Sequence, residues 1–359
     1  MNLLNKIFFS KYYKFTFFSE KKNYQPYIID LIEKVSQNYE VLYLSLDKND
    51  RIDKKNVTNL YIGNFLVKLL IFKFIKTKFF LLTMTDLDNS FLKKSKKVDY
   101  YIFFFHAAAS THKQLTKGAF NNYDIIFANG IFQIQELREL ERINHSKKKE
   151  IYPTGYMYFD YLLKIPKKNH ENYILFAPSW GYSKENCLDK YGYKIISKLL
   201  DLKNKVIFRP HPEHYKRSKI TLEIIKNNFE HNSNFIFDQN FNNVESIQKS
   251  KLVITDYSAI ALEAFYPFFK PVLYINSANK IHNNIFEDMK LVAIEDEIRD
   301  LFGTQIYPNQ IDNMNYFLEK SVSKMENNKK KIKNFYNLKY ANIEKVVDNC
   351  YEILMKYDQ

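Results

Sequence analysis

The sequence predicts an α/β protein made of two halves, each with a parallel sheet and crossover helices. Apolar runs of strand length alternate with helical patterns along most of the chain, and this alternation is typical of parallel sheets. In the first half, strands are expected at Val41–Leu46, Phe79–Met84, Asp99–Phe105 and Asp124–Ala128. In the second half, they are expected at residues 173–177, 205–209, 234–238, 251–255 and 271–275. With 359 residues, the chain is long enough for two domains with cores of their own.

Residues 164–172 are polar and interrupted by proline, a composition typical of a linker. We therefore expect a first domain at residues 1–165 and a second at residues 166–325. Residues 326–359 are expected to form a charged helical tail. Its apolar face consists of Ile343, Val346, Val347, Cys350, Ile353, Leu354 and Tyr357.

The chain carries 54 basic and 40 acidic side chains, which gives a net charge of +14. A balance this basic favours a phosphate-rich partner, although lysine enrichment on solvated faces explains part of it. Cys187 and Cys350 are far apart in sequence and lack the spacing of metal ligands. We expect no disulfide framework, no metal site and no cofactor, and a cytoplasmic location fits this cysteine usage.

No segment reaches the ~20 uninterrupted apolar residues of a membrane-spanning helix. Residues 1–18 have lysines throughout their apolar stretch and no small-residue cleavage site, so they make a poor signal peptide; an interfacial basic-aromatic segment is one interpretation. In Asn64–Thr77, Lys68, Lys73 and Lys76 fall roughly on one helical face of an otherwise apolar segment. This pattern suits a helix on an anionic membrane surface, or a core-facing helix with a narrow solvated stripe.

Polar residues follow four of the expected strands. Asp256, Tyr257 and Ser258 come directly after the strand that ends at Thr255, and a helix containing Glu263 follows. Free N–H groups at such a helix start attract phosphate, hydroxyl groups add donors, and Glu263 suits ribose hydroxyls. The alternatives are an ordinary βαβ unit with Ser258 as the helix N-cap, and an exposed helix carboxylate at residue 263.

The other three polar clusters occupy residues 106–113 (HAAASTHK), 178–181 (PSWG) and 209–214 (RPHPEH). In open α/β sheets, ligands bind outside the carboxyl ends of the strands. Surface turns need Gly, Asn or Pro, but they do not need repeated His and Arg. The four clusters together therefore predict a binding site at this edge of each sheet.

These motifs carry a resemblance to a known family. Three motifs resemble, in their order along the chain, those of the CDP-glycerol glycerophosphotransferase family of teichoic-acid and capsule polymer synthesis. They are Phe105-His106 with His112-Lys113, then Arg209-Pro210-His211-Pro212, then Asp256-Tyr257-Ser258-Ala259 followed by Glu263. The resemblance covers roughly residues 80–280. It implies the GT-B fold, in which two Rossmann-like domains face a central cleft. Three departures concern the donor: Ala107 replaces a common Gly, Ala259 replaces a second Ser, and Glu263 replaces a frequent Asp.

The resemblance also implies roles for the residues that match the motifs. His106, Arg209 and His211 are the expected catalytic residues, with His106 as the base. The expected donor-binding residues are Pro178, Ser179, Thr255, Asp256, Ser258, Ala259 and Glu263, and the expected acceptor-side residues are Ser110, Thr111, His112 and Lys113. The implied partners are a CDP-polyol or nucleotide-sugar donor and an anionic glycan or lipid-linked acceptor, with contact to the inner face of the cytoplasmic membrane as a further option.

Each role has a plain structural alternative. His106 also suits a strand-end cap, and Arg209 with His211 suits a proline-flanked surface turn. Asp86 and Asp88 imitate a metal-binding Asp-x-Asp motif, but we interpret them as loop residues. For the whole chain, the alternatives are a sugar transferase with a nucleotide-sugar donor, a UDP-sugar 2-epimerase, and a basic nucleic-acid-binding protein, which lacks a matching module here.

Overall fold

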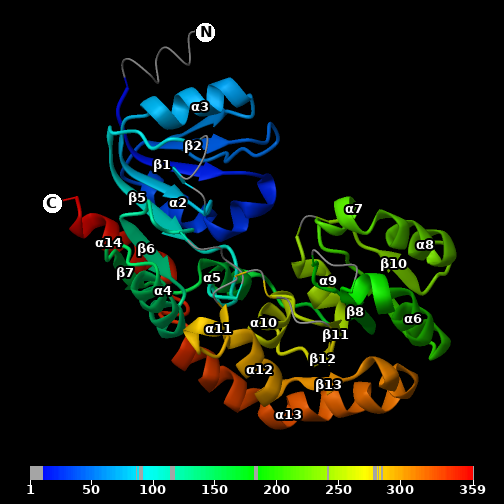
Figure 1. Cartoon of the computed structure of the whole chain (residues 1–359). Helices are drawn as coiled ribbons and strands as arrows, with labels where there is room; N and C mark the ends of the chain where they lie inside the picture. The colour runs from blue at the N-terminus through cyan, green and yellow to red at the C-terminus, as the bar shows by residue number, and fades with distance from the viewer. Residues whose placement is uncertain are drawn as a thin grey trace.

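In the computed structural model, two parallel sheets form separate bodies that the C-terminal helices join (Figure 1). The structure describes residues 11–85, 87–88, 92–113, 118–181, 185–240, 242–277, 281, 283 and 286–358. The predicted fold class, two Rossmann-like domains with crossover helices, is confirmed.

The first sheet contains seven strands within the described residues, in the order β3-β2-β1-β4-β5-β6-β7, and all its pairs are parallel. Its strands are β1 (Tyr13–Ser19), β2 (Val41–Ser45), β3 (Val57–Tyr61), β4 (Thr77–Leu82), β5 (Val98–Phe104), β6 (Ile125–Ala128) and β7 (Glu150–Pro153). The helical elements of this half are η1 (Lys22–Tyr27), α2 (Ile29–Ser36), α3 (Phe65–Phe74), α4 (Ile131–Ile143) and α5 (Met157–Lys164).

The second sheet contains six strands within the described residues, in the order β10-β9-β8-β11-β12-β13, again all parallel. Its strands are β8 (Tyr173–Phe176), β9 (Lys205–Phe208), β10 (Phe235–Phe237), β11 (Ser250–Thr255), β12 (Val272–Ile275) and β13 (Thr304–Ile306). The helical elements are α6 (Cys187–Asp201), α7 (His214–Arg217), α8 (Lys219–Phe229), α9 (Val244–Lys249), α10 (Ile260–Phe265), α11 (Phe286–Met289), α12 (Ile294–Phe302), η2 (Pro308–Asn313), α13 (Met314–Lys339) and α14 (Val346–Lys356).

The interpretation of the N-terminal segment as interfacial is wrong for the part that the structure describes. Residues 13–19 form β1, which lies between β2 and β4 near the middle of the first sheet. Phe15, Phe17 and Phe18 are buried there, on both faces of the sheet. Lys14 points to Asp358, with 2.8 Å between its Nζ and the carboxylate, so the lysine that suggested a surface segment forms an ion pair.

The C-terminal helices pack against both domains. The expected boundary at residues 325/326 falls inside α13, which runs along the second domain, while α14 lies on the first (Figure 1). Met314 belongs to the core of the second sheet, whereas Cys350 and Leu354 of α14 belong to the core of the first. The chain passes so close to Gly155 (φ +102°) that a Cβ atom there would lie 2.2 Å from the carbonyl oxygen of Ala341. Only glycine allows this approach.

A third core lies at the junction of the domains. Tyr156 and Phe159 of the first domain pack with Phe265 and Tyr266 of the second, and with Tyr336 of α13. This burial holds the two sheets in one relative orientation. Among the residues that the structure describes, no helix combines the length and apolarity needed to cross a bilayer.

Candidate functional site

Side chains that follow strands of both sheets come together at the domain junction, among them Tyr156 after β7 and Glu263 after β11. Tyr24 and Tyr27 follow β1 in the first domain, and both rings lie against the imidazole of His106, which follows β5, with centroid distances of 4.9 and 6.3 Å. From the second domain, Arg209 and Glu263 come close enough to perturb the pKa of Tyr27. Residues from both halves thus meet at one place, as expected for ligand sites of parallel sheets.

His106 lies in an environment that keeps its ring neutral. Surrounding protein atoms strip the imidazole of water and lower its pKa to about 4. Its Nδ1 atom is buried and has no hydrogen-bond partner among the described residues. A neutral imidazole with an unused nitrogen is able to accept a proton.

Arg209 and His211 follow β9, next to the turn after β8. The Arg209 amide donates to the carbonyl of Phe176, and its guanidinium donates to Asp238 at 2.6 Å. Asp238 is buried and also accepts from Ser246, so the guanidinium is held in one orientation. The Nδ1 atom of His211 accepts from the Glu213 amide at 3.2 Å, so in the neutral ring the proton resides on Nε2.

Asp238 was not among the residues predicted for the site. It follows the three-residue strand β10 as a single acidic residue in a polar stretch. Trp180 lies 6.0 Å from His211 between ring centroids, and the Arg217 guanidinium lies 5.1 Å from the Trp180 ring. The indole therefore packs among the residues of the Arg209 loop.

Several residues that were expected to bind the donor form hydrogen bonds within the protein. The Ser179 amide and hydroxyl donate to the two carboxylate oxygens of buried Asp256 at 2.6 and 2.8 Å, and the Thr255 hydroxyl donates to the Ala177 carbonyl at 2.7 Å. These bonds join the turns after β8 and β11 at the same edge of the sheet. Because their polar atoms are engaged, Ser179, Thr255 and Asp256 shape the turn in this structure.

Ser258 is the half-buried hydroxyl of this turn. Its Oγ lies 3.5 Å from the Ile260 amide, at the limit of a hydrogen bond. The N-cap position of α10 is Ala259, which has no side chain able to cap, and the Ser258 hydroxyl one residue earlier accepts from the first amide of the helix. Pro178, directly before Ser179, is buried.

Glu263 is buried, which excludes the alternative of an exposed helix carboxylate. Its two oxygens accept from the Tyr156 hydroxyl at 3.2 Å and from the Asn243 amide at 2.6 Å. Tyr158 donates to the same Asn243 at 2.9 Å, so two tyrosines of the first domain reach this acid. Burial raises the pKa of Glu263 to about 7, although Asn243, Tyr156 and Arg209 act in the opposite direction.

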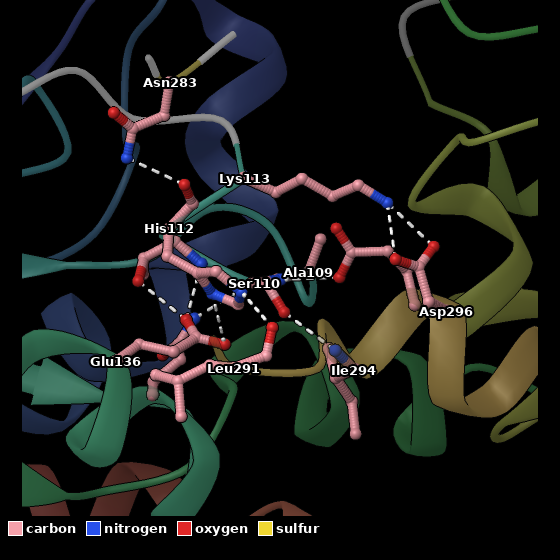
Figure 2. Close-up of polar contacts among 12 residues, drawn as sticks. Ala109, Ser110, His112, Lys113, Glu136, Asn283, Leu291, Ile294 and Asp296 are labelled. Atoms are coloured by element: carbon pink, nitrogen blue, oxygen red, sulfur yellow. Dashed lines mark hydrogen bonds and ion pairs between the residues drawn. The ribbon is translucent and has the colours of Figure 1, made fainter. Parts of the chain in front are cut away.

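Three of the four expected acceptor-side residues, Ser110, His112 and Lys113, lie in a contact between the domains (Figure 2), and Thr111 lies beside them in sequence. The Ser110 amide donates to Glu295 at 2.9 Å, and the Ser110 hydroxyl accepts from the Ile294 amide at 2.8 Å. Thr111 donates through its amide and its hydroxyl to Glu136, both at 2.7 Å. All four side chains are buried, so in this structure they contact protein.

His112 and Lys113 complete this interdomain contact. The His112 ring lies 3.1 Å from Glu136 through Nδ1 and 3.1 Å from the Leu291 carbonyl through Nε2. Burial lowers the pKa of His112, but the hydrogen bond and charge of Glu136 outweigh it, so the pKa is raised. The Lys113 ammonium pairs with Asp296 at 2.6 Å.

Only one carboxylate of the Asp-x-Asp pair lies among the described residues. Asp86 lies outside the described residues, and Asp88 accepts from the Lys94 amide at 3.2 Å. Within the residues that the structure describes, no group of three or more His, Cys, Asp or Glu side chains is arranged to hold a metal ion.

Comparison with known proteins gives one family and several similar structures. The profile of a family described as CDP-Glycerol:Poly(glycerophosphate) glycerophosphotransferase matches residues 81–338. The wall teichoic acid polymerase TagF superposes with a TM-score of 0.63 at 14% identity, covering 96% of this chain and 88% of TagF. UDP-GlcNAc 2-epimerase from Methanocaldococcus jannaschii gives a TM-score of 0.57 at 13% identity, with coverage of 96% and 100%. Among curated proteins there is no match.

A TagF variant soaked with CDPG is also similar, with a TM-score of 0.61 at 15% identity and coverage of 96% and 88%. At these identities the structural likeness concerns the fold alone. The GT-B-like arrangement of two parallel-sheet domains is therefore confirmed, and the roles of individual residues are not tested by it.

The buried acid gives a pH-dependent prediction. Glu263 binds its proton up to about pH 7 in the folded chain but only up to about pH 4.5 when unfolded, so wild-type stability should fall as pH rises through this window. Glu263→Gln removes the titration. Chemical unfolding gives the free energy of unfolding of both proteins at pH 5 and pH 8. The difference between the variant and wild type should shift in favour of the variant by up to about 3 kcal/mol from pH 5 to pH 8.

The control for this measurement is Glu245→Gln on the neighbouring α9, whose carboxylate is exposed and pairs with Lys249. It should follow the wild-type pH dependence. An unchanged pH dependence in Glu263→Gln would contradict the raised pKa.

Proposed function

This chain belongs to the CDP-glycerol:poly(glycerophosphate) glycerophosphotransferase family, and we propose that it transfers a glycerol-phosphate-like unit from a CDP-activated polyol to a hydroxyl group of a teichoic-acid-type or other cell-surface polymer precursor. The observation that supports this most is that Tyr27, whose ring lies against His106 of the first domain, is also close to Arg209 and Glu263 of the second. A transfer between two bound substrates needs this placement, because donor and acceptor must be brought together.

In the proposed reaction, the acceptor oxygen attacks the phosphorus that carries the polyol. A new P–O bond forms to the acceptor, the P–O bond to CMP breaks, and the acceptor proton moves to a base. Catalysis of such a transfer consists mainly of positioning and of neutralising charge on the phosphates and the leaving group.

His106 is the proposed base. Its lowered pKa keeps the ring neutral at physiological pH, and a base must be neutral to accept a proton. The rate should therefore fall only on the acid side, below the ordinary imidazole pKa. The positions of Tyr24 and Tyr27 against the ring suggest that they shield the base from water until the acceptor replaces them.

Arg209 and His211 are the proposed phosphate ligands. Asp238 orients the Arg209 guanidinium, and Nε2 of His211 has the proton that a phosphate oxygen accepts. Ser258 and the backbone of residues 256–259 complete the proposed donor site, with Pro178, Ser179, Thr255 and Asp256 holding the turn in shape. A ribose hydroxyl would replace one of the present donors to Glu263, either Tyr156 or Asn243.

For Ser110, Thr111, His112 and Lys113, the buried contacts favour an indirect role. They fix the loop that carries His106 against the second domain, and we propose that the acceptor approaches from the side of His106 itself. A nucleotide-sugar donor is the second candidate, because structures of UDP-GlcNAc 2-epimerases share the fold with similar TM-scores.

The proposed roles are tested by a pair of substitutions. His106→Ala should lower transfer by ~10²–10⁴-fold and leave CDP affinity nearly intact, because a base touches the acceptor and not the nucleotide. Arg209→Ala should weaken CDP binding by about 1.5–3 kcal/mol, the worth of a charged hydrogen bond. Calorimetric titration with CDP and a product assay separate the two effects. Transfer by His106→Ala at close to the wild-type rate would refute the assignment of the base.

We further propose that α3 contacts an anionic membrane surface on which a lipid-linked acceptor is presented. Four apolar side chains of this helix are largely exposed: Phe65 (54%), Leu66 (67%), Leu70 (49%) and Phe74 (43%). Ile71 and Phe72 alone are buried, so the helix is anchored by one side only. Lys68 and Lys73 lie over the rings of Phe65 and Phe74, which places positive charge beside the apolar face. This combination suits the boundary between acyl chains and acidic headgroups.

Vesicle co-sedimentation tests this contact. Binding of the wild type should rise with the content of anionic lipid and fall with salt, because the lysines are attracted to the headgroups. Leu66→Ser combined with Leu70→Ser should reduce binding severalfold. Ile220→Ser, which removes a side chain of similar exposure (73%) on α8 of the second domain, is the matched control. Equal binding by the double variant and the control would overturn the proposal.

A further inference from the structure

An alternating series of cations and aromatic rings connects the two domains at the donor turn. The Lys113 ammonium, from the first domain, lies 4.9 Å from the ring centroid of Tyr257. The Arg299 guanidinium, from α12, lies 4.3 Å from the same ring and 4.9 Å from the ring of Tyr274 in β12. We call Lys113, Tyr257, Arg299 and Tyr274 the cation–aromatic ladder.

Hydrogen bonds hold both cations of the ladder in place. Arg299 is 4% exposed and donates to the carbonyl oxygens of Asp256 at 2.9 Å and Ile275 at 3.3 Å, and to the side chain of Asn276. It thereby fixes the carboxyl ends of β11 and β12. Lys113 is 1% exposed and pairs with Asp296, one turn before Arg299 on α12.

We propose that Tyr257 and Arg299 are positioning residues that set the donor turn, and that Lys113 ties this turn to the loop carrying His106. The proposal rests on the proposed function, because it gives that site two further residues. Tyr257 stands between Asp256 and Ser258 in the sequence, so a shift of its ring moves the backbone that is proposed to hold the diphosphate. The position of the donor turn therefore depends on the presence of the first domain.

The burial of both cations makes this coupling strong enough to measure. A cation over an aromatic face contributes more when water is excluded, and Phe presents a similar face to Tyr whereas Leu presents none. Replacing the Tyr257 ring by a Leu side chain should therefore weaken the coupling between the domains, and removing only the ring's hydroxyl should leave it unchanged. A role in packing alone would be served by Leu as well.

The test compares Tyr257→Phe with Tyr257→Leu in the full chain. The CDP dissociation constant, measured by calorimetry, should stay within about twofold for Tyr257→Phe and rise about five- to thirtyfold for Tyr257→Leu. Lys113→Met should weaken CDP binding less in the Tyr257→Leu background than in wild type, since the ring that it acts on is gone. If the Tyr257→Phe and Tyr257→Leu variants bound CDP with equal affinity, the proposed role of the ladder would be wrong. It would also be wrong if the effects of Lys113→Met and Tyr257→Leu on CDP binding were additive.

A second readout needs no nucleotide and separates this proposal from the proposed function. Without ligand, the amides of Ser110 and Thr111, bonded to Glu295 and Glu136, should exchange hydrogen faster in Tyr257→Leu than in Tyr257→Phe. If wild type fails to bind CDP, the proposed function fails, and this exchange still decides on the ladder. Identical exchange in both variants would refute the coupling of the two domains.

Discussion

The contact between the loop after β5 and residues 291–296 is the interaction on which the rest of the structure depends. It places His112, Lys113, Glu136 and Glu295 in a nearly water-free junction, where each charge has to be compensated within the protein. Breaking one such buried pair typically costs about 3–5 kcal/mol, because the remaining charge stays buried. The loop is therefore held in one conformation, and its other end carries His106.

This constraint explains the electrostatics of the candidate site. Protein atoms, among them the rings of Tyr24 and Tyr27, desolvate His106 and lower its pKa to about 4. Glu263 is buried where Tyr156 of the first domain reaches it, and this burial raises its pKa to about 7. Both shifts favour the neutral form, as desolvation does. Arg209 forms an ion pair with Asp238, which holds its guanidinium in place near these two groups. An arrangement of this kind suits an anionic ligand whose charge would otherwise be unbalanced.

Much of the fold was predictable, because buried parallel strands are continuous apolar runs that stand out between amphipathic helices. The predicted strands correspond to β2, β4, β5, β6 and β8–β12, and the four motifs were expected at strand ends where the structure has them. β1 was missed because Lys14 interrupts its apolar pattern and suggested a surface segment. The edge strands β3 and β13 were missed because they are short and half-polar. The segment of β7 was predicted to end the first half but was not predicted to be a strand.

The partners of the motif residues were not predictable from local sequence. Asp238, Tyr156, Asn243 and Arg299 reach Arg209, Glu263 and the Asp256 turn across tens of residues, so no spacing rule identifies them. For the same reason, local sequence does not reveal that Ser110, His112 and Lys113 contact residues 291–296. A motif reports which side chains are present, and the tertiary structure decides which of them remain available to a ligand.

The measurement that tests the central claim most directly is the product formed by the wild-type chain from CDP-glycerol and, separately, from UDP-GlcNAc, in the presence of a glycerol-phosphate-primed acceptor. The account predicts that CMP is released from CDP-glycerol in step with glycerol phosphate added to the acceptor, and that UDP-GlcNAc remains unchanged. Conversion of UDP-GlcNAc, by transfer or by epimerisation, with CDP-glycerol left intact would contradict the account.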